Sequence, residues 1–441
     1  MYQFRDPIHG FIEVTELELK IIDSPSFQRL RNIRQLSTTY LVYHGAEHAR
    51  FGHSIGVMHL VSRAFNSAVK NYERETKEEL FCKIDKEWYS QILRIIALVH
   101  DLGHAPFSHG SEVLFDDGLE HENFTKEIIC GTEIAGYIND IGENFVKEHN
   151  AGEKYLITPE LIWLIYGNKN PELDKRYIMP DFKFLKSFMD SDLDCDKMDY
   201  LLRDSHYCGV NYGKYDLERL LSSLTVHYNS KDKIMQLGIE SGGIHAFEEF
   251  VIARYFMFIQ VYFHKTRRYL DKLLVDCISS VLENSKYPSN LSEYLKLDDE
   301  YIIAKIQERA DKDLNAGNFV KRKVMSCIYE TPAHSFAESD KQLFNAIKKE
   351  LKNNNFDIIE DDANKFAHKL SPVFEQYDDP DSGKEIPIID RQLKKPAHIL
   401  EKSILLQSLR KPINIRRIYV DKGHSEKARN IVYAMLNGEE E

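Results

Sequence analysis

Apolar side chains recur every three or four positions along much of the first 285 residues, which is the spacing of a helix with one buried face. Residues 53–72 show this spacing clearly, with Ile55, Met58, Val61 and Phe65 on one side. We therefore expect a core helix there. The same pattern predicts further helices over residues 17–36 (interrupted near Pro25), 88–102, 158–166, 181–204, 215–226 and 244–285, the last one long and rich in aromatic residues.

Alternating apolar and polar residues, the pattern of a half-buried strand, are rare before residue 285. One such stretch lies at 11–14, and apolar strand-like runs reappear at 356–362, 386–390 and 413–420. Turn residues near 286 mark the change in pattern. We therefore expect a mainly α fold: a large helical domain over residues 1–285, followed by a smaller α+β C-terminal domain over 286–441 that serves regulation or oligomerisation.

Composition and charge narrow the class of protein. The 441 residues are 43% hydrophobic and carry a formal net charge of −12, which disfavours non-specific binding to nucleic acid. The first ten residues lack the apolar run of a signal peptide, and no stretch reaches the ~18 apolar residues of a membrane span. Six irregularly spaced cysteines without a CxxC pair suggest reduced thiols. We expect a cytoplasmic protein with no membrane contact.

The segment 94–109, RIIALVHDLGHAPFSH, ends a buried helix with His100 and Asp101 and adds two more histidines. His53 heads another core helix, and residues 190–199 hold five aspartates, among them Asp196. Two imidazoles with two carboxylates suit a divalent transition metal that keeps open positions for water and substrate. The residues alone leave simpler interpretations open, because buried histidines often only cap or hydrogen-bond, and aspartates favour the start of a helix.

Several motifs together resemble one protein family. They are DPIHGFIEV, FQRLRNIRQL, GAEHARFGHSIGV, HDLGHAPFSH, EHENF and DCDKMDYLLRD, in this order within residues 5–280. This set resembles the HD-domain superfamily of metal-dependent phosphohydrolases. More narrowly, it is similar to the deoxynucleoside triphosphate triphosphohydrolase branch, which includes the SAM-and-HD-domain dNTPase of vertebrates and its bacterial relatives.

The resemblance implies an HD-domain helical catalytic core with the metal at its centre. It implies that His53, His100, Asp101 and Asp196 are the metal ligands. It also implies hydrolysis of a deoxynucleoside triphosphate (dNTP) to a deoxynucleoside and inorganic triphosphate. The ion itself stays open among Mg, Mn, Fe, Zn and Ni, since such ligands suit all of them.

The resemblance also implies roles for residues around the metal. His121 matches the catalytic histidine and is our candidate general acid for the leaving 5′ oxygen, with Glu122 setting its charge. His104 and His109 would contact phosphate, although His109 is as well explained by packing or capping at the turn around Pro106. Here we expect His104 to share the face of His100, if the helix continues.

A second group matches positions that bind the rest of the nucleotide. Arg50, Lys197, Arg254 and Tyr262 would bind the substrate, Tyr200 and Asp204 would lie beside the sugar, and Gln35 and Leu36 would pack against the deoxyribose and exclude a 2′ hydroxyl. For Arg254 the alternative is an ordinary surface cation, since surface arginines are common.

A further set of residues bears on regulation. Asp23, Gln28 and Arg31 match guanine-reading positions of the family's allosteric site, whereas Tyr2 and Arg5 occupy the region of its preceding basic residue. The resemblance thus suggests dGTP or GTP as activator and a homotetramer, without the family's SAM domain ahead of the catalytic region. Two other functions stay open: hydrolysis of another nucleotide phosphoester, and nucleotide binding by a regulatory protein without turnover.

Overall fold

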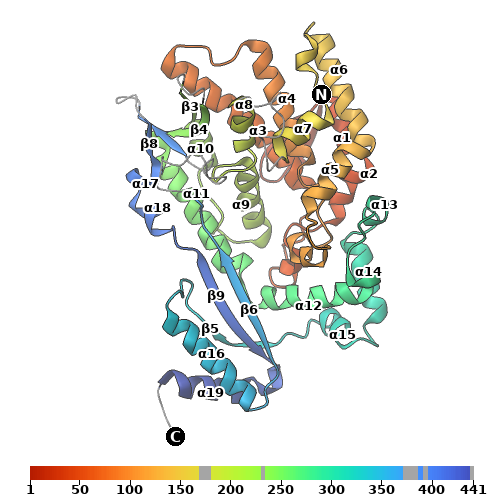
Figure 1. Cartoon of the computed structure of the whole chain (residues 1–441), viewed down its shortest axis with the longest axis vertical. Coiled ribbons are helices and arrows are strands. Elements are labelled where there is room, and N and C mark those ends of the chain that lie inside the picture. Colours follow the sequence, from red (N-terminus) through yellow and green to blue (C-terminus); the bar gives the residue numbers. More distant parts are fainter. Residues whose placement is uncertain (168–179, 230–233, 371–385, 391–395, 438–441) are drawn as a thin grey trace.

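The protein is described here by a computed structural model that covers residues 1–167, 180–229, 234–370, 386–390 and 396–437. The fold is mainly α, as the sequence predicts. Figure 1 shows a helical body, from which two long strands lead down to a lobe near the C-terminus. Among the described helices, none combines the length and the apolarity that crossing a bilayer requires.

Two helices form the centre of the body. In α3 (Arg50–Thr76) and α4 (Lys83–Val99) the predicted apolar faces are buried, and the two helices pack against each other. α3 begins after Ala49 in extended conformation and ends at Lys77, whose φ of 62° stops the helix. Around them lie α1 (Glu16–Ile22), α2 (Pro25–Gln28), α5 (His121–Gly131), α6 (Glu133–Glu148), α7 (Pro159–Tyr166), α8 (Pro180–Ser187), α9 (Cys195–Cys208), α10 (Leu217–Ser222), α11 (Ile244–Met257) and α12 (Lys265–Val281).

The described residues form three small sheets. β1 (Tyr2–Asp6) and β2 (Gly10–Val14) make an antiparallel hairpin, which confirms the strand expected at 11–14. The second sheet has the order β3 (Leu224–Asn229), β4 (Ile234–Glu240), β7 (Pro387–Ile389), β8 (Pro396–His398), and the third has the order β5 (Ser326–Glu330), β9 (Ile413–Val420), β6 (Ile358–Lys365). β6, β7 and β9 therefore lie where the apolar runs at 356–362, 386–390 and 413–420 predict strands, whereas β5 and β8 were not predicted.

Three predicted helices are shorter than expected. The segment 215–226 ends as α10, and its last residues begin β3, because Thr225, Val226 and Tyr228 suit a strand that pairs with β4. The segment 244–285 is interrupted by a π-helical turn (Phe258–Tyr262), and the His264 side chain caps a new helix at the amide of Thr266. The segment 181–204 is likewise split into α8 and α9, where Asp194 caps α9.

Aromatic stacking and strand pairing cross the domain boundary that we expect near residue 286. Tyr294, in α13 (Leu291–Tyr294), stacks on Phe124 of α5 with ring centroids 3.9 Å apart, and β7 pairs in parallel with β4. The remaining helices are α14 (Asp299–Arg309), α15 (Leu314–Val320), α16 (Glu338–Asn353), α17 (Ile399–Lys402), α18 (Ile404–Ser408) and α19 (Ser425–Asn437). In Figure 1, α16 and α19 cover the lower sheet. The division into two domains stays a prediction.

A buried carboxylate joins the lower sheet to the body. Asp361 on β6 is fully buried and accepts hydrogen bonds from Arg268 Nη2 on α12 (2.6 Å) and Arg417 Nη1 on β9 (3.4 Å). We expect Asp361→Ala to remove the carboxylate shared by Arg268 and the buried Arg417, which keeps only Glu330 as an ion-pair partner, and to lower the free energy of unfolding by about 3 kcal/mol in chemical denaturation. Asp362→Ala is the control, because its ion pair with Arg416 is exposed and is worth at most about 1 kcal/mol. Equal losses would contradict this role of Asp361.

Candidate active site

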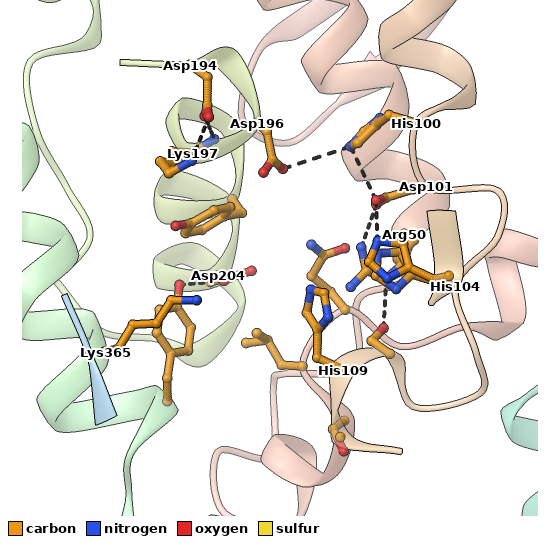
Figure 2. Close-up of a pocket in the computed structure, with 18 of the residues that line it drawn as sticks. Arg50, His100, Asp101, His104, His109, Asp194, Asp196, Lys197, Asp204 and Lys365 are labelled. Atoms are coloured by element: carbon orange, nitrogen blue, oxygen red, sulfur yellow. Dashed lines mark hydrogen bonds and ion pairs between the residues drawn. The ribbon is translucent and has the colours of Figure 1, made fainter. Parts of the chain in front are cut away.

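One cavity of about 720 Å³ brings together almost every residue that the sequence singles out for the site. It lies between α9, the break between α11 and α12, and the loop that follows α4 (Figure 2). Its lining includes Gln35, Leu36, Arg50, His100, Asp101, His104, His109, His121, Glu122, Asp196, Lys197, Tyr200, Asp204, Arg254 and Tyr262. His53 lies behind this wall and is fully buried.

The four predicted metal ligands converge from three helices. His53 comes from the first turn of α3, His100 and Asp101 follow the last residue of α4, and Asp196 lies in the first turn of α9. His53 Nε2 is 2.9 Å from Asp196 Oδ1 and 3.7 Å from Asp101 Oδ2. His100 Nε2 is 3.3 Å from Asp101 Oδ1 and 3.9 Å from Asp196 Oδ1. Two ligands bound at about 2.1 Å and at right angles lie about 3 Å apart, so these spacings fit one ion.

The hydrogen bonds of the two rings leave one nitrogen of each for a cation. His100 Nδ1 donates to the carbonyl of Ala97 at 2.7 Å, and His53 Nδ1 donates to Asp199 Oδ2 at 2.8 Å. A carbonyl only accepts, so the proton is on Nδ1 and the Nε2 lone pair of His100 is free. Both Nε2 atoms are buried and have no hydrogen-bond partner among the described residues. Buried polar atoms are rarely left so, and a metal ion would satisfy both.

The charges at this centre also favour a cation. Burial opposes the charged form of Asp101, but Arg50 and the neighbouring histidines outweigh it and hold the pKa of Asp101 well below its usual range. Burial likewise disfavours a protonated His53, yet the carboxylates of Asp196 and Asp199 raise its pKa to about 10, so without an ion a second proton on His53 supplies the positive charge there. The carboxylates thus stay ionised and attract positive charge to the place where the Nε2 atoms meet.

A second cluster gathers three histidines around a carboxylate that the sequence analysis missed. Glu112 Oε1 lies 2.9 Å from His121 Nδ1 and 3.2 Å from His104 Nδ1, while Glu112 Oε2 lies 2.8 Å from His109 Nδ1. His104 and His121 stack with ring centroids 4.0 Å apart. The predicted partner, Glu122, is farther from His121 Nδ1, at 3.4 Å. A glutamate three residues after a histidine is a weak signal that nonetheless points to Glu112.

The path of the chain explains how these histidines meet. α4 ends at Val99, so the expected helical continuation from His100 to His104 is wrong, and a turn places His104 in the pocket instead. Farther on, Phe107 and Ser108 have φ values of 62° and 55°, and the buried Asp299 of α14 accepts the Phe107 amide at 2.7 Å. This left-handed turn directs His109 back to Glu112, leaving its side chain 67% exposed.

The opposite wall of the cavity is rich in cations and hydroxyl groups. Arg254 is 6% exposed, so the alternative of a surface cation is wrong, and its Nε has no hydrogen-bond partner among the described residues. Lys197 Nζ contacts Asp194 at 2.6 Å. Tyr262 Oη donates to Asp204 Oδ2 at 2.7 Å, which fixes this side of the wall. A buried guanidinium with a free donor indicates an anionic ligand.

Lys365, at the end of β6, is a pocket residue that the sequence gave no reason to choose. Figure 2 shows it on the side of Lys197 and Asp204, pointing across the cavity toward His109. No carboxylate of the described residues pairs with it, whereas the other described lysines and arginines of the lining have one. Burial and the nearby charges of Arg254, Lys369 and Lys197 lower its pKa. A lysine without a carboxylate partner, close to other cations, is suited to bind an anionic group of a ligand.

The predicted allosteric residues lie outside the pocket. Gln28 Oε1 accepts a hydrogen bond from Arg31 Nε at 2.8 Å, and Arg31 lies over the ring of Phe51. Asp23 is the residue that ends α1. Their reading of a guanine base stays a prediction.

Two family models match the chain: the one described as HD domain matches residues 50–176, and the one described as HD associated region matches residues 215–360. The uncharacterized protein YwfO of Bacillus subtilis is 33% identical over 70% of this chain and 66% of its own length. The deoxynucleoside triphosphate triphosphohydrolase SAMHD1 homolog of Dictyostelium discoideum is 29% identical over 76% of this chain and 59% of its own length.

A solved structure resembles the whole chain. The crystal structure of a hypothetical protein from Aquifex aeolicus is 29% identical, covers 98% of this chain and 99% of its own, and superposes with a TM-score of 0.73. The chain spans between 55% and 66% of the length of three curated relatives that it matches. The similarity to the Aquifex aeolicus structure therefore covers the whole fold, including the residues that line the cavity.

The contact between Glu112 and His121 leads to a testable prediction about the pKa of His121. Burial disfavours the imidazolium of His121, but its hydrogen bond to Glu112 outweighs burial and raises its pKa. We expect Glu112→Gln to lower the pKa of His121, measured by NMR titration of ¹³Cε1-labelled histidines with His121→Asn to assign the signal. Glu122→Gln is the control and should shift the pKa less, because Glu122 lies farther from Nδ1. A larger effect of the control would assign the charge of His121 to Glu122.

Proposed function

The chain belongs to the HD-domain phosphohydrolases, and on this basis we propose that it hydrolyses deoxynucleoside triphosphates to deoxynucleoside and inorganic triphosphate. The observation that carries the proposal is the content of one cavity. Three of the four candidate ligands, His100, Asp101 and Asp196, line the same 720 Å³ as a histidine cluster and three cations from the opposite wall, Lys197, Arg254 and Lys365, and His53 lies directly behind them. That volume suits a small ligand such as a nucleotide.

His53, His100, Asp101 and Asp196 would hold a divalent cation, which when bound would polarise a phosphate oxygen and lower the pKa of the attacking water. Arg50 then acts on the same phosphate, because its guanidinium, 2.6 Å from Asp101 Oδ2, lines the pocket beside the ligands. The leaving 5′ oxygen needs a proton. His121 would supply it, since Glu112 favours its protonated form and the ring lines the pocket.

The cations on the opposite wall would bind the rest of the triphosphate. Arg254 offers a free Nε, Lys197 lies one turn before Tyr200 on α9, and Lys365 has no carboxylate partner among the described residues. Together they offset the charge of a bound polyphosphate in a cavity that already contains several carboxylates. Binding the β- and γ-phosphates there would leave the α-phosphate at the metal, which is the arrangement that cleavage to inorganic triphosphate requires.

The sugar would lie against a rigid polar wall. Tyr262 Oη donates to Asp204 Oδ2 at 2.7 Å, and His48 Nε2 lies 2.9 Å from Asp204 Oδ1. Gln35 and Leu36 line the same cavity, and the Gln35 Oε1 is buried without a hydrogen-bond partner among the described residues. These side chains would exclude a 2′ hydroxyl by their bulk, and this favours a deoxynucleotide.

Activation by dGTP or GTP at Asp23, Gln28 and Arg31, in a homotetramer, completes the proposal. The hydrogen bond between Gln28 and Arg31 supports it, because the two side chains are already held in one orientation at the surface. The site is separate from the catalytic cavity, so an activator and a substrate would bind at the same time.

A product assay tests the function directly. The purified chain is incubated with each dNTP, singly and in pairs, with Mg²⁺ or Mn²⁺, and the products are separated by chromatography. We expect deoxynucleoside and inorganic triphosphate, lost on chelation of the metal. Deoxynucleoside monophosphate and pyrophosphate would contradict the cleavage position, and turnover of another phosphoester alone would assign a different substrate. No turnover of any nucleotide would favour a regulatory binding protein.

Phosphate binding by Lys365 can be tested separately by steady-state kinetics. We expect Lys365→Ala to raise KM for dNTPs about tenfold, as for the loss of a charge-assisted hydrogen bond, and to weaken inhibition by inorganic triphosphate by a similar factor. Lys369→Ala is the matched control, because Lys369 is close in sequence and charge but does not line the cavity. If both variants change KM by the same factor, Lys365 makes no direct contact with the phosphates and contributes only to the overall positive charge of this wall.

A further inference from the structure

We propose that the turn between β1 and β2 is part of the metal centre, because His9 and Asp6 position the ligand His53 through Asp199 and Arg203. The inference rests on the metal site of the proposed function, but not on the identity of the substrate. His9 and Asp6 lie outside the stretch that the HD-domain model matches, and they do not line the cavity. They act as positioning residues, because they reach His53 only through Asp199 and Arg203.

Asp199 is the centre of this network. Its Oδ2 accepts hydrogen bonds from His53 Nδ1 at 2.8 Å and from Arg203 Nε at 2.7 Å. Its Oδ1 accepts from His9 Nε2 at 2.7 Å and from Arg203 Nη2 at 2.9 Å. The side chains of His9, His53, Asp199 and Arg203 are at most 2% exposed, so water does not compete for these bonds. Each carboxylate oxygen therefore has two fixed donors, and Asp199 has little freedom to move.

The local geometry of α9 explains why Asp199 reaches His53. Asp196, Asp199 and Arg203 recur at three and four positions, so they share one face of the helix. Asp196 at one end of this face points to the metal centre, and Arg203 at the other end grips Asp199 with two nitrogens. α3 leaves room for the carboxylate at Gly56, where a Cβ would lie 2.1 Å from Asp199 Oδ1. The close approach of the two helices thus depends on a glycine.

The turn Asp6–Gly10 is built to present His9 to this carboxylate. Asp6 Oδ1 accepts the amides of Ile8 at 2.8 Å and His9 at 2.9 Å, which shapes the turn. Asp6 Oδ2 accepts Arg203 Nη1 at 2.9 Å. Gly10, with a φ of 77°, then starts β2. Asp6 therefore both places His9 and holds the far end of the arginine.

These contacts affect the metal through His53. A carboxylate that accepts the Nδ1 proton of a histidine ligand fixes the ring and makes its Nε2 more basic, and losing such a partner costs about 10- to 100-fold in metal affinity. His9 and Arg203 determine where Asp199 lies. Without the His9 bond, Asp199 Oδ1 keeps Arg203 Nη2 as its remaining donor, and the partner of His53 is held less firmly.

Metal binding by the full-length protein, without any nucleotide, tests the proposal. Mn²⁺ affinity is measured by calorimetry or by the EPR signal of free Mn²⁺. We expect His9→Phe, which keeps a ring but has no donor, to weaken the Kd about tenfold, the lower end of the range for a direct partner of a ligand, and His9→Gln, which keeps an N–H donor, to recover part of this loss. His59→Phe is the matched control. Its ring lies 5.6 Å from that of His9 but makes no hydrogen bond to Asp199, so its Kd should stay close to that of the unchanged protein.

Thermal unfolding in the presence of a chelator separates positioning from simple support of the fold. A purely structural bond would lower the unfolding midpoint of His9→Phe and leave the Kd of the folded protein unchanged, and that result would overturn the proposal. Asp6→Asn keeps the test decisive should His9→Phe fail to fold. Asparagine has one side-chain oxygen, whereas Asp6 uses two, so we expect the Asp6→Asn variant to bind Mn²⁺ more weakly as well. An unchanged Kd for Mn²⁺ would contradict the proposal.

The same measurements distinguish this proposal from the proposed function. If the unchanged protein binds Mn²⁺ but releases no triphosphate from any dNTP, the function fails while the role of His9 remains testable. If His9→Phe turns over dNTPs and binds Mn²⁺ as the unchanged protein does, the role of His9 fails and the function stands. Should the unchanged protein bind no divalent metal at all, the role of His9 is overturned as well.

Discussion

The structure depends on the burial of several carboxylates next to two histidine rings. Taking ionised carboxylates out of water is costly unless each has a partner of opposite charge or a full set of donors. Asp199 finds Arg203 and two histidines, and Asp101 finds Arg50 at 2.6 Å. Asp196 lies beside the Nε2 atoms of His53 and His100, and no described arginine or lysine forms an ion pair with it. This imbalance is why the convergence of α3, α4 and α9 calls for a metal ion.

Sequence reasoning located the parts of this centre that follow from short-range patterns. The apolar period of residues 88–102 places His100 and Asp101 at the end of a core helix, and the apolar run at 413–420 coincides with β9 (Ile413–Val420). Where two patterns overlap, the prediction fails: the leucines of 215–226 fit a helix, yet their last residues join β3. The π-helical break at Phe258–Tyr262 lies in a continuous aromatic run that shows no local stop signal.

The residues that the sequence missed are those whose partners are remote. His9 and Asp199 are 190 positions apart, and Lys365 reaches the cavity only because β6 extends up to the helical body. No pattern in either segment indicates such a contact before the fold is known. From the residues alone, a metal site and an ordinary capped core helix were both open; the resemblance selected the ligand set, and the two free Nε2 atoms now support it independently.

The two clusters in the cavity are joined by Asp101, and this connection divides the work of the histidines. Asp101 Oδ1 lies 3.3 Å from His100 Nε2 and 3.2 Å from His104 Nε2, so one carboxylate borders both the metal centre and the histidine cluster. Burial and the charge of Arg50 lower the pKa of His104 to about 3, whereas Glu112 raises that of His121, its stacked neighbour. Two rings in contact do not both carry a proton easily, and their surroundings push their pKa values apart. His104 is thereby a neutral group between Asp101 and His121, and protonation is favoured on His121, the ring beside Glu112.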